Sequence, residues 1–413
     1  MSFIFIFTLY TIQVKAMSLK ICCCIIALIA FCSLCMNACT SSTQNQLPPK
    51  KKQPDDFGKI DALPLSYKSP ENNQSTPEKI ELGRLLFYDP ILSGGKDVAC
   101  ATCHHPEFGY AESLEISIGV NGKGLGERRA FNSNNDIPFT RRNAPSILNT
   151  AFNGIDINGN YDPEKAPMFW DLRTSGLEEQ ASFPVKAFEE MRGHKFEDIK
   201  IEYEIVKRIN SITAYQKLFR KVFPGDDKVT ISNITKAIAC FERSLTANNS
   251  RFDKYMRGDE TALSTREIDG MKAFMEAGCA RCHSGPMLSD FKPHVLGLAD
   301  NDKLSASDSG YQSTYAFRTP TLRNLRRTRP YMHNGKLQTL DNVMLFYEDL
   351  HGKELPNKNV HKEQLDSLAV KLNVEFKNID AIIEFLNTLN DDDYDKKIPT
   401  SVPSGLQVGG SIR

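Results

Sequence analysis

The chain has 413 residues, 40% of them hydrophobic, and its 51 basic residues balance 51 acidic ones, so the formal net charge is zero. This is the composition of an ordinary globular protein, and the length is sufficient for two or three domains. Without an excess of basic charge, the sequence gives no reason to expect a nucleic-acid partner.

The first residues look like an export signal rather than part of the fold. A second methionine, Met17, begins a short basic segment that leads into the apolar run 21–34. This pattern is typical of a signal peptide, and the apolar run is too short to span a membrane as a mature helix. We therefore expect residues 1–39 to be the signal, with translation starting at Met1 or Met17, and the mature protein to be exported to the periplasm.

The end of that signal carries a candidate lipid attachment site. The junction Ala38–Cys39 resembles a bacterial lipoprotein cleavage box, in which the cysteine receives the lipid. Lipid anchoring at Cys39 is one interpretation, and ordinary secretion is the other. Residues 40–75 are polar and rich in proline, and we expect them to form a linker.

Ordered structure is predicted to begin with a helix after Thr76. Thr76-Pro77-Glu78 combines an N-cap residue, a proline at the first helical position and an acidic first turn. Apolar residues at helical spacing follow, and Asp89-Pro90 is expected to end the helix. The chain then enters the first of two related cysteine motifs.

The pattern Cys-x-x-Cys-His occurs twice, and it is the attachment motif for c-type haem. The cysteines bond to the haem vinyl groups, and the histidine binds the iron. A lone Cys-x-x-Cys could instead be part of a zinc site or a redox dithiol. Here histidine follows both times, and no further cysteine pair would complete a tetrahedral zinc site. We expect two covalently bound haems c, attached through Cys100, Cys103 and His104 and through Cys279, Cys282 and His283.

The segments around the two motifs repeat each other. Before the second motif, Ser264-Thr-Arg-Glu267 is a capping box, and Gly278 ends the predicted helix. Each half also closes with a similar apolar helix, whose matching residues are Ile238, Phe241 and Leu245 in one half and Ile382, Phe385 and Leu389 in the other.

Strand signals are few, so the predicted class is mainly α, with two cytochrome c-type haem domains in tandem. We place the N-terminal haem domain at 76–262, the C-terminal haem domain at 263–392 and a solvated, disordered tail at 393–413. Cys240 is the cysteine left over from the signal, the lipid site and the motifs, and its apolar neighbours predict a buried, inert thiol.

Five further stretches resemble those of the bacterial di-haem cytochrome c peroxidases and their relatives of the MauG (methylamine-utilisation) type. They are LLFYDP at 85–90, RNAPSILN at 142–149, FWDLR at 169–173, FRTPTLRN at 317–324 and PYMHNG at 330–335. The resemblance spans about residues 82–389. It implies that the haem at His104 reacts with peroxide and that the haem at His283 transfers electrons.

The resemblance also implies a peroxide pocket, which Gln180, Pro184 and Glu190 match. Heterolysis of the O–O bond requires a proton to move from the inner to the outer oxygen, and a carboxylate such as Glu190 can carry it. Without the resemblance, Glu190 reads as an exposed helix charge beside Glu189. His105, next to the first iron ligand, is expected at the surface or behind the ligands.

Two further sites follow from the same resemblance. Trp170, the single tryptophan, matches the residue that lies between the two haems, where it relays electrons; packing in the core is the alternative role. Asn143, with the backbone carbonyls of Thr328 and Pro330, matches a calcium site, and hard oxygen ligands suit that ion.

The chain departs from part of the family at the first haem. Peroxidases that need reductive activation carry a histidine after Ser-Ile-Gly, and it blocks the peroxidatic iron. Here Val120 follows Ser117-Ile-Gly, and valine cannot bind iron. We expect the first haem to be five-coordinate and high-spin, unless a histidine from elsewhere, such as His194, moves in.

A second departure concerns the other iron. Family peroxidases carry a methionine fourteen residues after the histidine of the His-Asn-Gly stretch, and counting from His333 gives Tyr347, as in MauG-type proteins. A phenolate oxygen stabilises ferric iron, whereas a methionine thioether favours ferrous iron and raises the potential. Met344, one helical turn earlier, is the competing ligand, and Met332 is a weaker one.

These residues favour an enzyme that reduces hydrogen peroxide to water with electrons from a small exported cytochrome c or copper protein. One alternative is a MauG-like enzyme that uses a high-valent two-haem state to oxidise residues of a partner protein. The other is a di-haem electron-transfer cytochrome without catalytic activity. A homodimer is the oligomeric state that accompanies the first interpretation.

Overall fold

The computed structural model describes residues 58–352 and 354–413, so the predicted signal, Cys39 and the first half of the predicted linker lie outside the described residues. Within the described part, helices are the main regular structure, and none of them is long and apolar enough to cross a membrane. The strands are short and form antiparallel pairs: β1 (Gly122–Lys123) with β2 (Ala130–Phe131), β3 (Pro167–Met168) with β4 (Thr174–Ser175), and β5 (Pro293–Val295) with β6 (Ala316–Arg318). The prediction of a mainly α class is confirmed.

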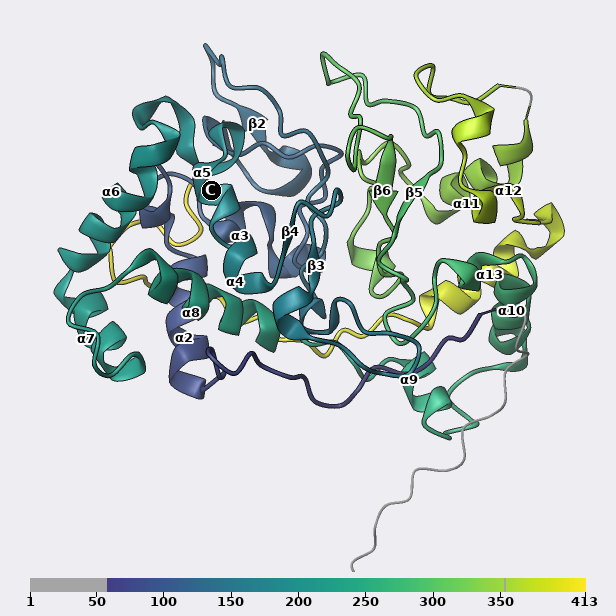
Figure 1. The fold of residues 1–413 in the computed structure, drawn as a ribbon, viewed down its shortest axis with the longest axis horizontal. Helices are drawn as coiled ribbons and strands as arrows, with labels where there is room; N and C mark the ends of the chain where they lie inside the picture. Colours follow the sequence, from purple (N-terminus) through teal and green to yellow (C-terminus); the bar gives the residue numbers. More distant parts are fainter. Residues whose placement is uncertain (1–57, 353) are drawn as a thin grey trace, which may run out of the picture. The chain divides into compact units, whose positions relative to one another are not determined.

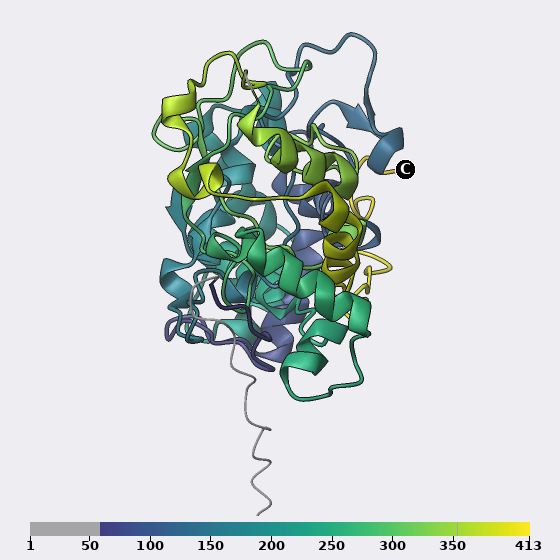
Figure 2. The same ribbon diagram turned by 90° about the vertical axis from the view of Figure 1, so that its right-hand side faces the viewer.

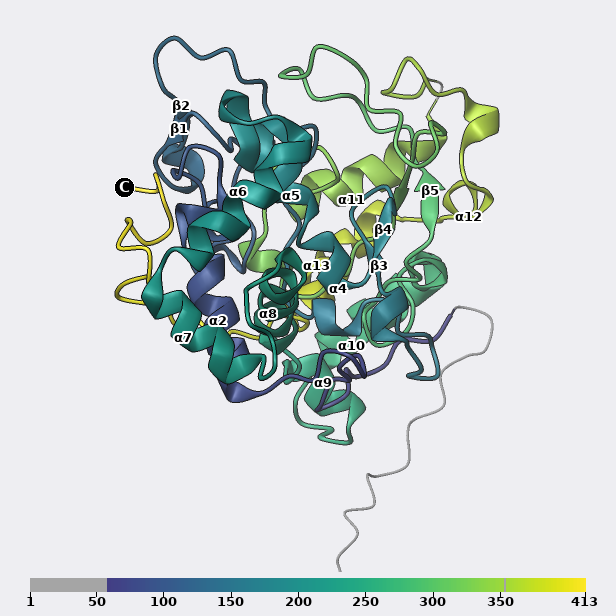
Figure 3. The same ribbon diagram turned by 60° about the vertical axis from the view of Figure 1, so that its left-hand side comes forward.

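The first half is built around α2 (Pro77–Phe87), which packs against α8 (Ile231–Ser244). α2 begins as predicted, because the Thr76 side chain accepts a hydrogen bond from the Lys79 amide and Pro77 takes the first helical position. The helices of this half gather on the left of Figure 1 and come forward in Figure 3. The others are α3 (Cys100–Cys103), α4 (Leu177–Gln180), α5 (Phe183–Lys186), α6 (Asp198–Asn210), α7 (Thr213–Val222) and the π-helical turn η6 (Phe188–Arg192).

The second half repeats this plan, with α10 (Thr265–Glu276) packed against α13 (Ile379–Asn387), and Figure 2 turns this side towards the viewer. The predicted capping box is present, since Ser264 and Glu267 exchange side-chain to backbone hydrogen bonds. Gly278 follows the helix with a φ of 88°, in the left-handed region that glycine tolerates. The remaining elements are η8 (Cys279–Arg281), a 3-10 turn, α11 (Leu340–Glu348), α12 (Ser367–Val370) and α9 (Arg251–Met256), which precedes the predicted boundary at 262 but places Phe252 in the core of the second half.

The two helix pairs cross in the same way, each at a glycine. A Cβ atom at Gly83 would overlap the Ala237 carbonyl oxygen of α8, and one at Gly270 would overlap the Ala381 carbonyl oxygen of α13. Four residues after each glycine, a phenylalanine packs on the closing helix, with ring centroids 5.1 Å apart for Phe87–Phe241 and 5.3 Å apart for Phe274–Phe385. The repeat predicted from the sequence is therefore present as two equivalent helix crossings.

Replacing Gly270 by alanine is expected to lower the free energy of unfolding by about 1–3 kcal/mol, because the added methyl group forces α10 away from α13. Thermal unfolding of the haem-loaded protein would measure the change. Lys272→Ala is the matched control, because Lys272 lies on the exposed side of the same helix and pairs with Asp269 alone. That variant is expected to stay within about 0.5 kcal/mol of the wild type. Equal effects of the two changes would contradict the glycine crossing.

Two extended segments, 58–75 and 393–413, connect the halves and correct two expectations. Residues 58–75 were predicted to belong to a tether, but Ile60 lies in the core of the second half and Asn73 donates to Glu178 of the first half at 2.7 Å. Residues 393–413 were predicted to be disordered, yet they run back from α13 to the first half, as the yellow segment in Figure 1 shows. There Tyr394 and Val402 enter the core. Composition misled the prediction, because a few apolar side chains and many backbone hydrogen bonds anchor these polar segments.

Candidate haem site

Both Cys-x-x-Cys-His motifs lie on short helical turns and line one cavity of about 640 Å³. Nδ1–H of His104 donates to the Tyr110 carbonyl, and Nδ1–H of His283 donates to the Leu288 carbonyl, each at 3.0 Å. A carbonyl accepts only from a protonated nitrogen, so in each imidazole the unprotonated nitrogen is Nε2. Each histidine therefore keeps Nε2 for a metal, which is the arrangement of a haem ligand.

The cysteines of the motifs suit covalent haem attachment. All four line the same cavity as the histidines. Burial raises the pKa of the Cys100 and Cys103 thiols, and it raises that of Cys279 to about 12. Neutral thiols beside an oriented histidine, repeated at two points of one cavity, fit two haems held by thioether bonds.

The predicted peroxide pocket lies on the wall of this cavity. Gln180 is the last residue of α4, Pro184 lies in α5, and Glu190 lies in η6; all three line the cavity. Burial, and then the charge of Glu189, raise the pKa of Glu190 to about 7. The interpretation of Glu190 as an exposed helix charge is wrong, because its side chain is half-buried and lines the cavity. A π-helical turn at this point is typical of functional sites.

The Ser117–Val120 segment packs behind that turn. A Cβ atom at Gly119 would overlap the carbonyl oxygens of Glu189 and Glu190, so glycine is needed for this close approach. The Val120 amide donates to the Glu189 carbonyl at 3.2 Å, and the Val120 side chain is buried. The segment therefore supports the backbone of Glu190, and Val120 is not among the residues that line the cavity.

Trp170 lies on the cavity wall between the halves. Its indole Nε1–H donates to the Asn143 carbonyl at 3.0 Å, and its own carbonyl accepts from the Arg318 amide at 2.8 Å. Its ring meets that of His333 edge to face, with centroids 6.5 Å apart. Phe169 and Leu172 have φ values of 62° and 57°, a conformation that bulky residues rarely adopt and that clusters at functional sites. The backbone around Trp170 is thus held from both sides.

The residues predicted for calcium also line the cavity. The Asn143 amide group donates to the carbonyls of Leu114 at 2.7 Å and Glu115 at 3.3 Å. Its Oδ1 therefore points away from these two carbonyl groups, and an amide oxygen is a ligand that suits calcium. Thr328 and Pro330 line the cavity beside it. This set fits a hard cation through oxygen atoms only.

Tyr347 and Met344 both lie on α11 and both line the cavity. Burial raises the pKa of Tyr347. Tyr347 packs with Cys279 in the core cluster of the second half, beside the second haem motif. Met344 packs in the core of the second half, and Met332 lines the cavity as well.

The structure also describes the three residues that were not expected to bind haem or peroxide: His105, His194 and Cys240. His105 is buried, and its Nδ1 accepts from the Glu107 amide at 3.3 Å, so it lies behind the motif rather than at the surface. The His194 side chain is exposed and contacts Asp136 at 2.9 Å, and His194 is not among the residues that line the cavity. Cys240 is buried as predicted, in the core side of α8.

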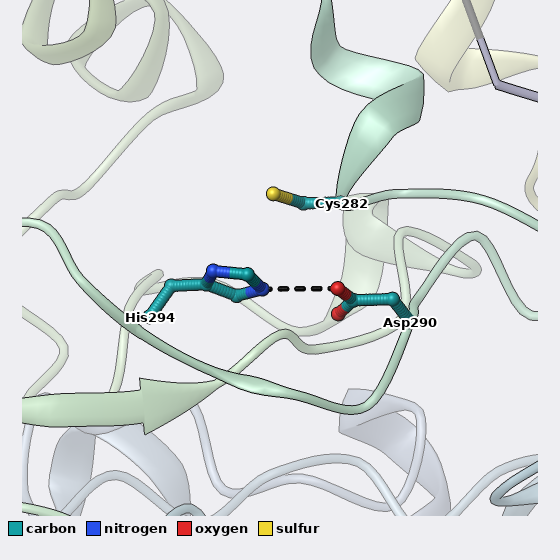
Figure 4. Close-up of side chains that lie close together, drawn as sticks. All are labelled: Cys282, Asp290 and His294. Carbon is teal, nitrogen blue, oxygen red and sulfur yellow. Dashed lines mark hydrogen bonds and ion pairs between the residues drawn. The ribbon is translucent and has the colours of Figure 1, made fainter. Parts of the chain in front are cut away.

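Cys282, Asp290 and His294 lie close enough together to hold a metal ion (Figure 4). Both nitrogens of His294 are already bonded, Nε2 to Asp290 at 3.0 Å and Nδ1 to Asp366 at 2.8 Å. Burial opposes the charged form, but the hydrogen bonds to the Asp290 and Asp366 carboxylates outweigh it and raise the pKa of His294 above its ordinary value. A charged imidazole has no lone pair for a metal, and Cys282 belongs to the haem motif. We infer that these residues stabilise the structure around the second motif and do not hold a metal ion.

The sequence analysis missed Glu242, a buried carboxyl of α8 that lines the cavity near Cys100. Burial raises the pKa of Glu242 to about 8. It also missed His333 as a cavity residue, whose ring stacks on Phe317 at 3.5 Å between centroids. Burial lowers the pKa of His333 to about 3. The FRTPTLRN stretch was noted only as a family marker, although residues 317–323 line the cavity.

Relatives decide which family this cavity belongs to. The chain matches a family profile described as di-haem cytochrome c peroxidase over residues 77–261. It is 34% identical over 289 residues to the methylamine utilization protein MauG of Methylorubrum extorquens, which covers 69% of this chain and 72% of that protein. It is 30% identical over 350 residues to the cytochrome c551 peroxidase of Nitrosomonas europaea, covering 83% of this chain and 87% of that protein. The chain belongs to the di-haem cytochrome c peroxidase family.

The fold agrees with this family. The crystal structure of a MauG-like protein associated with microbial copper homeostasis matches 80% of this chain and 95% of its own, with a TM-score of 0.64 and 27% identity. The diheme peroxidase BthA from Burkholderia thailandensis matches 87% of this chain and 97% of its own, with a TM-score of 0.60 and 21% identity. As a member of the di-haem peroxidase family, the protein is a peroxidase-type oxidoreductase with haem c as its cofactor. The resemblance stated from its motifs is confirmed.

Proposed function

We propose that the protein reduces hydrogen peroxide to water at the haem bound by Cys100, Cys103 and His104. The observation that carries this proposal is the position of Glu190, a carboxyl with a pKa of about 7 on the wall of the haem cavity. When bound, the haem supplies the iron that receives peroxide and the electrons that reduce it. The side chains of the pocket move protons and exclude other ligands.

In this proposal Glu190 accepts the proton of the inner peroxide oxygen and returns it to the outer one. A carboxyl group with a pKa near neutrality can do both, because each direction costs little free energy. Gln180 would orient the bound oxygens by hydrogen bonding, and Pro184 would limit the space above the haem. Packing of Val120 behind Glu190 supports an open face, since that segment supplies no iron ligand.

We further propose that the two halves act as tandem cytochrome c-type domains at 76–262 and 263–392. The second haem, held by Cys279, Cys282 and His283, would have Tyr347 as its other axial ligand and would pass electrons through Trp170. Burial of Trp170 between the halves and its bonded indole N–H support a fixed relay. A calcium ion at Asn143, Thr328 and Pro330 would hold this region together.

The electron donor, the cellular location, the membrane anchor and the oligomeric state complete the proposal. We propose a small exported cytochrome c or copper protein as the electron donor and a periplasmic location. A lipid at Cys39 and a homodimer are the accompanying proposals for anchoring and assembly.

The pH dependence follows from the raised pKa of Glu190. Its carboxylate form must be present to accept the first proton, so kcat/KM for peroxide is expected to fall as the pH drops below about 7. Steady-state rates at a series of pH values on either side of neutrality would show this limb. A limb with the same midpoint in Glu190→Gln would assign the titration to another group.

Oxidation of a partner protein, as in a MauG-like enzyme, is the second candidate, and the placement of Tyr347 beside the second motif favours it. A steady-state assay with peroxide and reduced cytochrome c separates the two. Rapid turnover supports the peroxidase, whereas spectral changes with peroxide but slow turnover support partner oxidation. Electron paramagnetic resonance of the oxidised protein tests the non-catalytic alternative: one high-spin and one low-spin ferric signal is expected, and two low-spin signals would reject the open first haem.

A further inference from the structure

Arg318 is a buried cation that faces the cavity without an acidic partner. It is the last residue of β6, is 8% exposed and lines the cavity. Within residues 58–352 and 354–413, its guanidinium makes one hydrogen bond, from Nε to the Phe169 carbonyl at 2.9 Å, and no ion pair. Burial lowers the pKa of Arg318 to about 10, so the side chain is still charged at neutral pH.

Other buried arginines of the described chain have partners that offset their charge. Arg129 lacks a carboxylate, but its guanidinium donates to the carbonyls of Ile118, Gly119 and Gly124. An unpaired buried charge is costly, and a cavity that holds an anion would remove the cost. The buried arginines with acidic partners are Arg84 with Asp395, Arg208 with Glu204, Arg243 with Glu178 and Arg323 with Asp253.

The position of Arg318 indicates which anion it meets. The residues after it, Thr319 and Thr321, are tied to the loop that follows His283: Ser289 Oγ donates to the Thr319 carbonyl, and Thr321 Oγ1 donates to the Met287 carbonyl, each at 2.7 Å. Arg318 is therefore fixed to the second haem motif through its own strand. Its backbone amide and Nε hold the Phe169–Trp170 backbone, which leaves the two terminal nitrogens for the cavity.

We propose that Arg318 binds a propionate carboxylate of the haem attached to Cys279 and Cys282. This inference rests on the proposed occupancy of that motif. A haem brings two carboxylates, and the planar guanidinium fork matches a carboxylate with two parallel hydrogen bonds. Arg318 is then a positioning residue that links the edge of the second haem to the backbone of Trp170. Its charge also favours the reduced form of that haem, because reduction removes a positive charge from the iron.

Redox titration of the haem-loaded protein tests this proposal without peroxide, so its outcome is independent of peroxidase activity. Arg318→Gln is expected to lower the midpoint potential of the second haem, to leave that of the first haem unchanged, and to shift the resonance Raman bending band of the haem propionates. Arg318→Lys keeps the charge and is expected to hold the potential near that of the wild type. Arg173→Gln is the matched control, because Arg173 also lines the cavity but pairs with Asp171.

Three results would overturn the proposal. The first is an unchanged second-haem potential and propionate band in Arg318→Gln. The second is a wild-type potential that follows the chloride or acetate concentration while that of Arg318→Gln does not, since a solvent anion would then occupy the site. The third is equal loss of both haems from the glutamine and lysine variants, since Arg318 would then serve the fold alone. Selective loss of the second haem from Arg318→Gln, with retention in Arg318→Lys, supports it.

Discussion

Replacing Glu190 by glutamine is expected to lower kcat/KM for hydrogen peroxide by ~10²-fold or more, because the amide cannot carry the proton between the two oxygens. A change in packing does not contribute to this loss of activity, because glutamine and glutamate side chains have nearly the same volume. Stopped-flow mixing of the oxidised protein with peroxide measures the step directly. Haem content and the resting spectrum of the variant should match those of the wild type.

Glu189→Gln is the control for this experiment. Glu189 lies beside Glu190 on the same turn, and its charge raises the pKa of Glu190. Removing that charge should keep turnover and move the acid limb of the pH profile to lower pH. A loss in Glu189→Gln as large as that in Glu190→Gln would mean that the turn, rather than one carboxyl group, is what catalysis requires.

Tyr347→Met is expected to raise the midpoint potential of the second haem by roughly 0.1 V or more, within the ~0.8 V that axial ligands span. The phenolate stabilises ferric iron, whereas the thioether favours ferrous iron. Burial raises the pKa of the Tyr347 phenol, so the bound iron has to displace its proton. Spectroelectrochemical titration of the two haems measures the change, and the first haem should keep its potential.

Met344→Leu distinguishes the two candidate ligands on α11. Met344 lines the same cavity one helical turn before Tyr347 and belongs to the core of the second half. If Tyr347 is the ligand, Met344→Leu leaves the low-spin spectrum of the second haem intact, while Tyr347→Phe abolishes it. If Met344→Leu instead abolishes the low-spin spectrum and Tyr347→Phe keeps it, Met344 is the iron ligand. A low potential of the second haem would then no longer be expected.

Local signals in the sequence predicted a large part of this structure. The capping residues Thr76 and Ser264, the stop at Asp89-Pro90 and the glycine at 278 are positions where one side chain or one φ angle decides the backbone. The Cys-x-x-Cys-His spacing likewise specifies its chemistry without reference to the rest of the fold. The predicted site residues, taken from motifs spread over the chain, all line one cavity.

Features that depend on contacts between distant parts of the chain could not be predicted from local sequence signals. Glu242 and Arg318 gain their properties from burial and from the lack or presence of partners far away in the chain. The packing of 393–413 depends on contacts such as Thr102 Oγ1 donating to the Gly409 carbonyl at 3.0 Å, across a separation of about three hundred residues. The polarity and periodicity of a segment do not predict its contacts with residues that are far away in the sequence.

The two extended segments cross between the halves in the same direction, each running from the second half to the first. The helix that carries Cys100 and Cys103 is closed by Gly409 and Gly410, so a nascent chain that has emerged only as far as α13 lacks part of the wall behind its first motif. Residues 393–413 therefore have to pack before the surroundings of the first motif are complete, although they lie about three hundred residues away in the chain.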